Sequence, residues 1–304
     1  MTDVLRSAVL RYSAFTTDPA GGNPAGVVLD ATGLDDARML AIAAEVGYSE
    51  TAFVFPRSLS PSTPTTTATT TTTTTFDVRY FSPLVEVPFC GHATVAAAVA
   101  LDRPGTLRFH TKAGLVEVAT GPGTASLTSV PTTSTPAPDS DVTEALRALR
   151  WSADDLDSRY PVHWALGGSR HLVLAVRTRE RLAALDYDFD ALGDLLRAND
   201  ALTAQLVHQR ADDVFDARDP FPVGGVVEDP ATGSAAAAFG GYLRAIGQVT
   251  RPRSLTLHQG EDMGRPSLLR IDVSPDDPRV TVTGSAVPIP GGAAPLGISG
   301  APQA

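Results

Sequence analysis

The stretch Glu228-Asp-Pro-Ala-Thr-Gly-Ser-Ala-Ala-Ala-Ala-Phe-Gly-Gly-Tyr-Leu243 has a counterpart earlier in the chain, Glu86-Val-Pro-Phe-Cys-Gly-His-Ala-Thr-Val-Ala-Ala-Ala-Val-Ala-Leu101. Aligned from their first residues, the two stretches share a Glu, a Pro, a Gly, two Ala and a final Leu at the same places. Each stretch is typical of a Pro/Gly turn followed by a helix of small apolar residues. The repeat predicts a duplicated domain with two similar helix starts.

Helix starts of this kind are potential anion sites, because the first backbone N–H groups of a helix have no intrahelical partner. The helix dipole adds to this attraction for negative charge. Gly91 and Gly233 stand at the two predicted starts, where glycine permits a ligand to approach the backbone closely. If the two starts face each other, they form one site that holds an anion, most simply a substrate carboxylate.

Outside the repeat, the apolar pattern predicts an α+β fold with a pseudo-twofold layout, in which strands flank one buried helix in each half. We expect an N-terminal half over residues 1–128 and a C-terminal half over 129–304, with a final strand able to cross back. A helix over 34–46 ends at Gly47, and strands cover 49–55 and 76–81. The Pro- and Thr-rich stretch 120–140 is expected to cross between the halves.

The segment 58–75 is almost entirely Thr, Ser and Pro. Such a composition buries too little apolar surface to order itself, so it predicts a mobile hairpin loop.

The bulk properties narrow the class of protein. A chain of 304 residues with 43% hydrophobic residues predicts two ordinary globular domains. The formal net charge of −10 argues against a nucleic-acid partner. The sequence contains no apolar run long enough to span a membrane and no secretory leader at its start, so we expect a cytoplasmic protein. Its single cysteine, Cys90, excludes an intramolecular disulfide and a cysteine-based zinc cage.

Four polar residues stand where chemistry is expected, and each has a plainer interpretation. His92 and Ser234 occupy matching positions of the repeat; a structural histidine and a helix N-cap are the alternatives. Asp229 precedes a proline and either caps the turn or serves as a polarising, proton-handling carboxylate. Glu50 begins an apolar strand, where partial shielding from water suits a general acid/base, or it is a solvated residue at a strand edge.

Taken together, six segments of the chain resemble the PhzF family, the phenazine-biosynthesis-like isomerases. The blocks that carry the resemblance span nearly the whole chain: 15–29 with Gly22-Asn-Pro-Ala-Gly26, Gly47-Tyr-Ser-Glu-Thr-Ala-Phe53, Val78-Arg-Tyr-Phe-Ser-Pro83, Phe89-Cys-Gly-His-Ala-Thr94, Glu228-Asp-Pro-Ala-Thr-Gly-Ser-Ala235 and Gln259-Gly-Glu-Asp-Met-Gly-Arg-Pro-Ser267.

That resemblance implies the diaminopimelate-epimerase-like fold, with two pseudo-symmetric halves that each wrap a mostly antiparallel sheet around a central helix. It also implies a homodimer, a small anionic substrate, and chemistry without an organic cofactor or a metal.

The resemblance further implies roles for individual residues. In the phenazine branch a glutamate moves a proton between ring carbons of a dihydro-hydroxyanthranilate, and by motif position that glutamate is Glu50. The supporting residues fall on His92, Asp229 and Ser234. The substrate carboxylate pocket would be lined by Asn23, Gly91 and Gly233.

Two other functions remain open from the sequence. One is an epimerase or racemase that uses Glu50 and Asp229 as opposed bases, and the other is a non-catalytic protein that binds a small molecule. The two-cysteine mechanism of the fold's better-known epimerases is excluded, because the repeat places Thr232 opposite the only cysteine, Cys90. Cys90 is therefore interpreted as a packing residue at the helix start rather than as a base.

Overall fold

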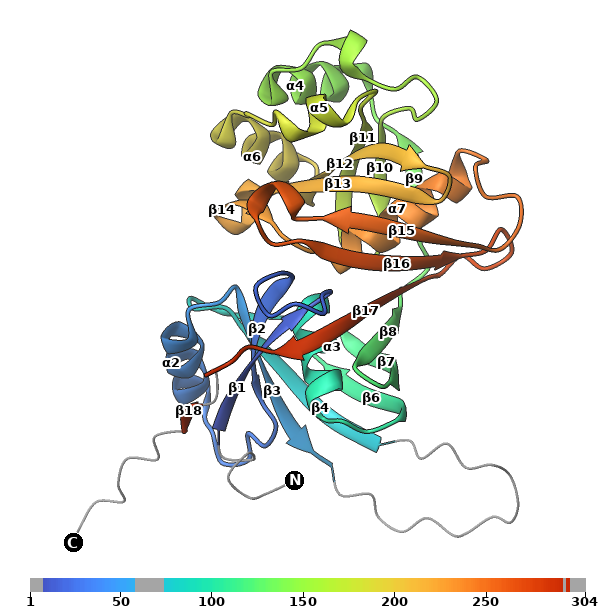
Figure 1. Ribbon diagram of the computed structural model, residues 1–304. Coiled ribbons are helices and arrows are strands. Elements are labelled where there is room, and N and C mark those ends of the chain that lie inside the picture. Colours follow the sequence, from blue (N-terminus) through green and yellow to red (C-terminus); the bar gives the residue numbers. More distant parts are fainter. Residues whose placement is uncertain (1–7, 58–73, 292–293, 296–304) are drawn as a thin grey trace, which may run out of the picture. The chain divides into compact units, whose positions relative to one another are not determined.

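The computed structural model describes residues 8–57, 74–291 and 294–295 (Figure 1). The chain divides into two compact units. The first takes its described residues from within Met1–Ala20, Pro24–Ala125 and Ser285–Ala304, and the second consists of Gly21–Asn23 and Ser126–Gly284. The loop predicted over 58–75 lies, for residues 58–73, outside the described residues; Thr74 and Thr75 begin a strand.

The first unit is a mixed sheet built around one helix. β2 pairs in parallel with β3, β3 pairs antiparallel with β4, β4 pairs in parallel with β6, and β6 forms a hairpin with β7. Helix α3 follows the short strand β5 and packs against β1, β3 and β7. The elements are β1 (Ala8–Ala14), β2 (Asn23–Val28), α2 (Asp36–Val46), β3 (Glu50–Pro56), β4 (Thr74–Phe81), β5 (Glu86–Val87), α3 (Gly91–Ala100), β6 (Gly105–Thr111), β7 (Gly114–Gly121), β8 (Thr124–Thr128) and β18 (Ala294–Pro295).

The second unit repeats this connectivity. β11 pairs in parallel with β12, β12 antiparallel with β13, β13 in parallel with β15, and β15 antiparallel with β16. Helix α7 follows β14 as α3 follows β5. The duplication predicted from the sequence is thus confirmed strand by strand. The elements are β9 (Thr133–Pro136), α4 (Asp139–Leu149), β10 (His163–Leu166), β11 (Arg170–Ala175), α5 (Arg179–Ala183), α6 (Phe189–Ala198), β12 (Ala201–Ala211), β13 (Val214–Phe221), β14 (Val226–Asp229), α7 (Gly233–Ala245), β15 (Arg253–Gln259), β16 (Ser267–Val273) and β17 (Val280–Pro288), with short 3₁₀ turns at Ala153–Asp155, Pro222–Gly224 and Glu261–Met263.

The two central helices are buried on nearly every face, which explains their composition. Alanine and glycine let a helix backbone approach surrounding strands closely. A Cβ atom on Gly240 would lie 2.9 Å from Ile271 of β16, and one on Gly241 would lie 2.2 Å from Thr132. The residues of α7 from Ala235 to Leu243 are all buried. The interpretation of both repeats as helices enclosed by a sheet is confirmed.

Further helices cover the outer faces of the two sheets. In the first unit, α2 packs Met39 and Ile42 into a cluster with Phe53 and Phe81. Asp35 caps its start, and Gly47, in the left-handed region at φ 72°, ends it as predicted. In the second unit, α4, α5 and α6 cover a larger apolar cluster that contains Trp164.

The turn that leads into each central helix is held by the same kind of ion pair. In the first unit, Arg79 of β4 donates from Nε and from a terminal nitrogen to the two carboxylate oxygens of Glu86, at 2.8 and 2.7 Å. In the second unit, Arg218 of β13 makes the same bidentate contact. Its Nε and a terminal nitrogen donate to the two carboxylate oxygens of Glu228, at 3.0 and 2.5 Å. Glu86 and Glu228 are the first residues of the two copies of the repeat.

Residues 120–140 contain more regular structure than expected. Their composition predicted a crossing segment, but the end of β7 and strands β8 and β9 lie within it. Thr and Ser are compatible with strand pairing, and here Ser126 and Thr128 each pair their hydroxyl with a threonine of β17. Within the described part of the chain, the search for helices of membrane-spanning length and apolarity found none.

The closeness of the β10–β11 turn to α7 yields a test of this packing. A Cβ on Gly167 would lie 2.3 Å from the backbone nitrogen of Ala238 and 2.6 Å from the backbone oxygen of Ser234. Because neither helix backbone atom can move aside, we expect Gly167→Ala to lower the free energy of unfolding by about 1–3 kcal/mol. Urea denaturation measures this value.

The control is the same substitution at Gly193 of α6. There the nearest atoms belong to the flexible guanidinium group of Arg197, at 3.1 Å. Because alanine is preferred over glycine inside a helix by roughly 0.5–1 kcal/mol, Gly193→Ala is expected to be neutral or stabilising. Equal stability of Gly167→Ala and the wild-type protein would contradict the packing described here.

Candidate active site

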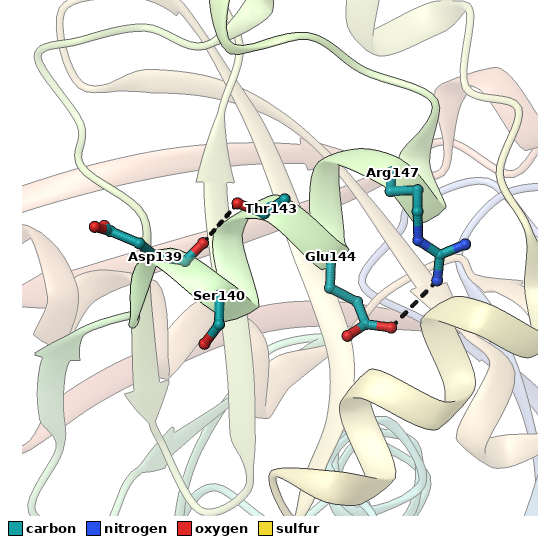
Figure 2. Close-up of a pocket in the computed structure, with 5 residues that line it drawn as sticks. All are labelled: Asp139, Ser140, Thr143, Glu144 and Arg147. Carbon is teal, nitrogen blue, oxygen red and sulfur yellow. Dashed lines mark hydrogen bonds and ion pairs between the residues drawn. The ribbon is translucent and has the colours of Figure 1, made fainter.

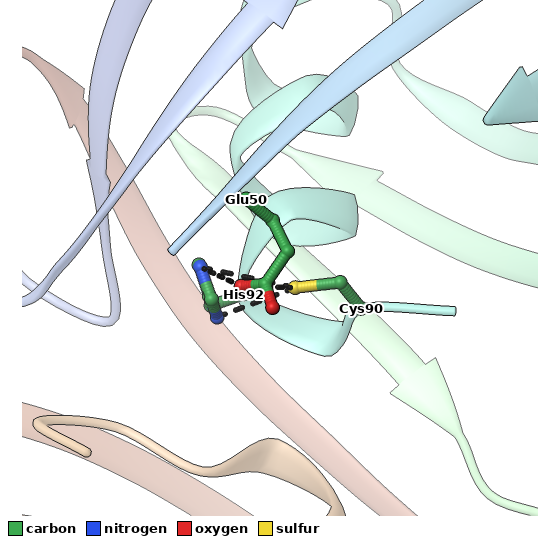
Figure 3. Close-up of side chains that lie close together, drawn as sticks. All are labelled: Glu50, Cys90 and His92. Atoms are coloured by element: carbon green, nitrogen blue, oxygen red, sulfur yellow. Dashed lines mark hydrogen bonds and ion pairs between the residues drawn. The ribbon is translucent and has the colours of Figure 1, made fainter. Parts of the chain in front are cut away.

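Three ionisable side chains of the first unit meet at the start of α3 (Figure 3). Glu50 is the first residue of β3, Cys90 is the N-cap of α3, and His92 is the second residue of that helix. The Cys90 thiol donates to Oε2 of Glu50 at 3.4 Å, and Nε2 of His92 lies 3.4 Å from the same oxygen. The Cys90 sulfur is also 3.4 Å from Nδ1 of His92. The structure therefore brings two of the predicted site residues, Glu50 and His92, into contact.

The local sequence explains how Glu50 arrives there. Gly47 turns the chain out of α2, and two residues later the hydroxyl of Ser49 lies 3.3 Å from Nε2 of His92. Glu50 then starts β3, pairing beside Ala25 of β2. Its side chain is 19% exposed, against 8% for His92, so the carboxyl group is shielded but accessible from solvent. That combination suits a group that must take up and release protons.

Cys90 was interpreted from the sequence as a packing residue, and that interpretation is incomplete. The residue is buried at the helix start, as expected, but its sulfur contacts both Glu50 and His92. The feature of the sequence that could have indicated these contacts is the position of Cys90, two residues before His92. A thiol in this position is part of the polar cluster rather than of the apolar core.

In the second unit, Asp229 ends β14 and is held from two sides. Its Oδ1 accepts from the side-chain nitrogen of Asn23 at 2.8 Å, and its Oδ2 accepts from the hydroxyl of Thr232 at 2.6 Å. Gln259, fully buried, donates to the backbone oxygen of Asp229 at 2.8 Å and accepts from the backbone nitrogen of Thr232 at 3.1 Å. The carboxylate is thereby fixed in one orientation.

Asn23 was expected to line the pocket for the substrate carboxylate. In the structure it is 2% exposed, and its side-chain nitrogen donates both to Asp229 and to the backbone oxygen of Ala231 at 3.1 Å. Arg265 holds the preceding residues through the backbone oxygens of Gly21 and Gly22, both at 2.7 Å. These contacts hold Asn23 against Asp229, and its place in a pocket for the substrate carboxylate stays a prediction.

Ser234 is not the helix N-cap that the plainer interpretation of the sequence suggested. Thr232 occupies the cap of α7, Gly233 is the first helical residue, and Ser234 is the second. Ser234 instead begins a chain of buried hydrogen bonds. Its hydroxyl lies 3.1 Å from Nε2 of His171 in β11, and Nδ1 of His171 lies 2.8 Å from the hydroxyl of Thr203 in β12.

The chain of hydrogen bonds ends at Asp219 of β13, which is fully buried. The Thr203 hydroxyl donates to Oδ1 of Asp219 at 2.9 Å. Because the hydroxyl proton of Thr203 is donated to Asp219, the Thr203 oxygen acts as acceptor toward His171 and takes a hydrogen bond from its Nδ1–H. The unprotonated Nε2 of His171 then accepts a hydrogen bond from the Ser234 hydroxyl. Ser234 thus donates its proton to His171, and its oxygen keeps the capacity to accept a hydrogen bond. His171, Thr203 and Asp219 were not singled out from the sequence, because they are scattered over three strands.

Burial sets the protonation of this chain. It lowers the pKa of His171 to about 3, so the imidazole is neutral at ordinary pH. Burial also raises the pKa of Asp219 well above its usual range, with a further contribution from the negative charges of Asp229 and Glu228. The side-chain amide of Gln205 lies about 3.3 Å from Oδ2 of Asp219 and can pair with it in either protonation state.

The predicted site residues thus fall into two polar clusters, one in each unit. Glu50 and His92 belong to the first, and Asp229, Ser234 and Asn23 belong to the second. Gly91 and Gly233 are the first residues of α3 and α7, as expected from the repeat. The two polar clusters therefore lie at equivalent helix starts.

A shallow hollow on the surface lies elsewhere, along the outer face of α4 (Figure 2). Its polar groups are already paired within the helix. Arg147 bonds to Glu144 at 3.2 Å, and the Thr143 hydroxyl donates to the backbone oxygen of Asp139 at 2.8 Å. It contains none of the predicted site residues, so we assign it no function.

The buried imidazole predicts a pH dependence of stability. The folded protein favours neutral His171, so its contribution is fully present above pH 6.5, the ordinary pKa, and is lost as the pH falls toward about 3. Within that window we expect wild-type protein to lose up to about 1.4 kcal/mol of unfolding free energy per pH unit relative to His171→Gln. Denaturant titrations across the window measure this difference.

His110→Gln, at a partly exposed position of β6, is the control and should follow the wild-type curve. Carboxylates titrate in all three proteins and cancel in the comparison. Parallel pH curves for the wild-type protein and His171→Gln would show that this imidazole is not buried as described.

Comparison with known proteins identifies the family. The family model for phenazine biosynthesis-like proteins, PhzC-PhzF, matches residues 12–292. An uncharacterised isomerase of Escherichia coli (strain K12), YddE, is 30% identical over 93% of this chain and 96% of its own length. Trans-2,3-dihydro-3-hydroxyanthranilate isomerase of Pseudomonas chlororaphis is 31% identical over 90% of this chain and 94% of its own.

Solved structures agree on the fold. The Bacillus anthracis phenazine biosynthesis protein of the PhzF family superimposes with a TM-score of 0.79 at 24% identity, covering 93% of this chain and 96% of that one. A probable proline racemase from Agrobacterium radiobacter K84 gives 0.58 at 12% identity, covering 96% and 93%. The expected diaminopimelate-epimerase-like architecture is confirmed. The chain belongs to the PhzC-PhzF family of phenazine biosynthesis-like proteins and is an isomerase.

Proposed function

We propose that this isomerase moves a proton between two positions of a small carboxylated substrate, with Glu50 as the general acid/base and without a cofactor. The observation that carries the proposal is the contact of one carboxylate oxygen of Glu50 with both Cys90 and His92, each at 3.4 Å. A proton shift of this kind needs a single group that first removes a proton from one carbon and then returns it to another.

The environment of Glu50 suits both halves of that transfer. As a carboxylate, Glu50 takes a proton from one carbon of the substrate. The electrons of the broken C–H bond pass into the conjugated system of the substrate. As a carboxylic acid it delivers the proton to the far end of that system, so atoms and charge balance without an oxidant or reductant. The Cys90 and His92 contacts hold the carboxyl group in place between the two steps. General acid/base catalysis of this kind contributes about 10²–10⁴-fold to the rate.

The substrate class follows from the helix starts and from a relative. The N-terminal turns of α3 and α7, which begin at Gly91 and Gly233, offer backbone N–H groups to a carboxylate. The relative named for isomerisation of trans-2,3-dihydro-3-hydroxyanthranilate acts on a carboxylated ring of this type. We therefore propose a cyclic, dihydroanthranilate-like substrate.

In the second unit, Ser234 and Asp229 are proposed to act as hydrogen-bond acceptors. Ser234 presents an acceptor oxygen, because its proton is directed to the neutral imidazole of His171. Asp229 is held in place by Asn23 and Thr232. Acceptors held in this way can orient a donor group of a ligand, such as a hydroxyl or amino group, without having to reorganise.

The epimerase alternative would need Asp229 to act as a second base at one carbon. Both oxygens of Asp229 already accept hydrogen bonds, at 2.8 and 2.6 Å, which fits a fixed polarising group better than a proton-abstracting one. A purely binding function would leave the contacts around Glu50 without a use. These observations favour the isomerase with one base.

A cytoplasmic homodimer completes the proposal. A lone thiol beside an acid/base glutamate is best preserved in a reducing compartment. Light scattering of the purified protein measures the oligomeric state, and a monomeric mass would contradict the dimer.

The central test is Glu50→Gln. The amide cannot exchange protons, so in D₂O with trans-2,3-dihydro-3-hydroxyanthranilate as the first probe we expect turnover and deuterium incorporation to fall by about 10²-fold or more. Ligand binding should be nearly unchanged, because the amide keeps the size of the side chain. NMR and mass spectrometry follow the label.

Glu45→Gln, on the exposed face of α2, is the matched control and should retain full activity. Deuterium incorporation that survives in Glu50→Gln would remove Glu50 from the role proposed. Inversion at a single carbon, in place of a shift between two carbons, would favour the epimerase.

A further inference from the structure

We propose that Glu50, Cys90 and His92 form a binding site for a thiophilic divalent cation, Zn²⁺ foremost, which competes with the proton for Glu50. The cation is an inhibitor in this proposal and not a cofactor. Binding at the site is independent of the function proposed above; only the inhibition rests on it.

The three ligand atoms already have the spacing that a tetrahedral ion requires. Oε2 of Glu50, Sγ of Cys90 and Nε2 of His92 are separated by 3.4 Å (O–S), 3.4 Å (O–N) and 3.8 Å (S–N). Zinc binds sulfur at about 2.3 Å and nitrogen or oxygen at about 2.0–2.1 Å, so neighbouring ligand atoms of a tetrahedron lie about 3.3–3.6 Å apart. An ion seated beside this triangle therefore reaches all three atoms with only small side-chain adjustments.

The chemistry of the three groups selects the kind of cation. Thiolate and imidazole favour Zn²⁺ and similar borderline ions, whereas Mg²⁺ and Ca²⁺ prefer sites built entirely of oxygen. The thiolate and the carboxylate bring two negative charges to the ion. The positive end of α3 opposes a cation only weakly compared with these ligand bonds. A site with one thiol differs from the several-cysteine cage that the composition excludes.

The backbone holds the ligands before any ion arrives. Cys90 and His92 are the N-cap and second residue of the buried helix α3, and Glu50 begins the neighbouring strand β3. Figure 3 shows the three side chains converging from these elements. Since Glu50 is 19% exposed, an ion can enter from its side, and a water molecule can fill the fourth position. Ion binding replaces the Cys90 S–H bond to Glu50 and the contact of Ser49 with Nε2 of His92, at 3.3 Å.

The experiment titrates the full-length protein, first treated with a chelator, with Co²⁺ and then with Zn²⁺. Co²⁺ reports its ligands by colour: a thiolate ligand produces a charge-transfer band in the near ultraviolet, and tetrahedral geometry produces intense visible bands. We expect one Co²⁺ per chain with both signals, and their loss when one equivalent of Zn²⁺ displaces the cobalt. Calorimetry gives the Zn²⁺ affinity.

Variants assign the ligands. Cys90→Ser is expected to remove the charge-transfer band, and Cys90→Ser and His92→Gln are each expected to weaken Zn²⁺ binding by at least about tenfold. His110→Gln, a histidine of the same unit outside the cluster, should bind as the wild-type protein does. Circular dichroism and melting curves show that the variants are folded. Failure of the wild-type protein to bind one Co²⁺ with a thiolate band, or equal Zn²⁺ affinity in Cys90→Ser, would overturn the site.

The activity assay separates this site from the proposed function. Stoichiometric Zn²⁺ should abolish turnover, and a chelator should restore it. If Zn²⁺ binds at Cys90 but Glu50→Gln remains active, the cation site stands and the role of Glu50 falls. If Glu50→Gln is inactive but no cation binds, the acid/base proposal stands and the cation site falls.

Discussion

A two-pronged arginine–glutamate pair fixes the turn before each central helix, and both polar clusters depend on it. Arg79 forms a bidentate ion pair with Glu86 in the first unit, and Arg218 forms one with Glu228 in the second. The second pair is nearly buried, with side chains 12% and 4% exposed. Loss of one partner of such a pair leaves an uncompensated charge, which costs about 3–5 kcal/mol. The pairs therefore hold the residues that follow, Cys90 in one unit and Asp229 in the other, in fixed positions.

The two units carry different residue types at equivalent positions of this shared backbone. Position two of the helix is His92 in one unit and Ser234 in the other, and the N-cap is Cys90 or Thr232. The first unit therefore gathers a thiol, an imidazole and a carboxyl group that can all exchange protons. The second gathers hydroxyls around a neutral imidazole whose pKa burial lowers to about 3. In the function proposed above, the first cluster transfers protons and the second accepts and donates hydrogen bonds.

The repeated sequence was sufficient to predict the fold, because the pattern that identifies it is local. Pro, Gly and Ala in fixed order specify the turn, the helix start and the close packing of α3 and α7, and the structure confirms each. Motif position also placed Glu50 and His92 in one candidate site, and the structure brings the two side chains into contact. The chain from Ser234 to Asp219 could not be predicted, because its members lie on three strands whose register only the folded sheet defines. The structure in 120–140 was missed because Thr and Ser suit strands and linkers equally.

Cys90 is the N-cap of α3, and the equivalent position of α7 is Thr232 rather than a second cysteine. A racemase that uses two thiols needs a second cysteine at the other helix start. Thr232 stands there instead, and its hydroxyl donates a hydrogen bond to Asp229 at 2.6 Å. A threonine hydroxyl so engaged cannot serve as the opposed base. The remaining thiol is left against Glu50 and His92, where its short contacts fix the carboxyl group. The same short distances give Cys90, Glu50 and His92 the spacing of metal ligands. The arrangement that we propose for proton transfer therefore also binds thiophilic cations, which the reaction itself does not need.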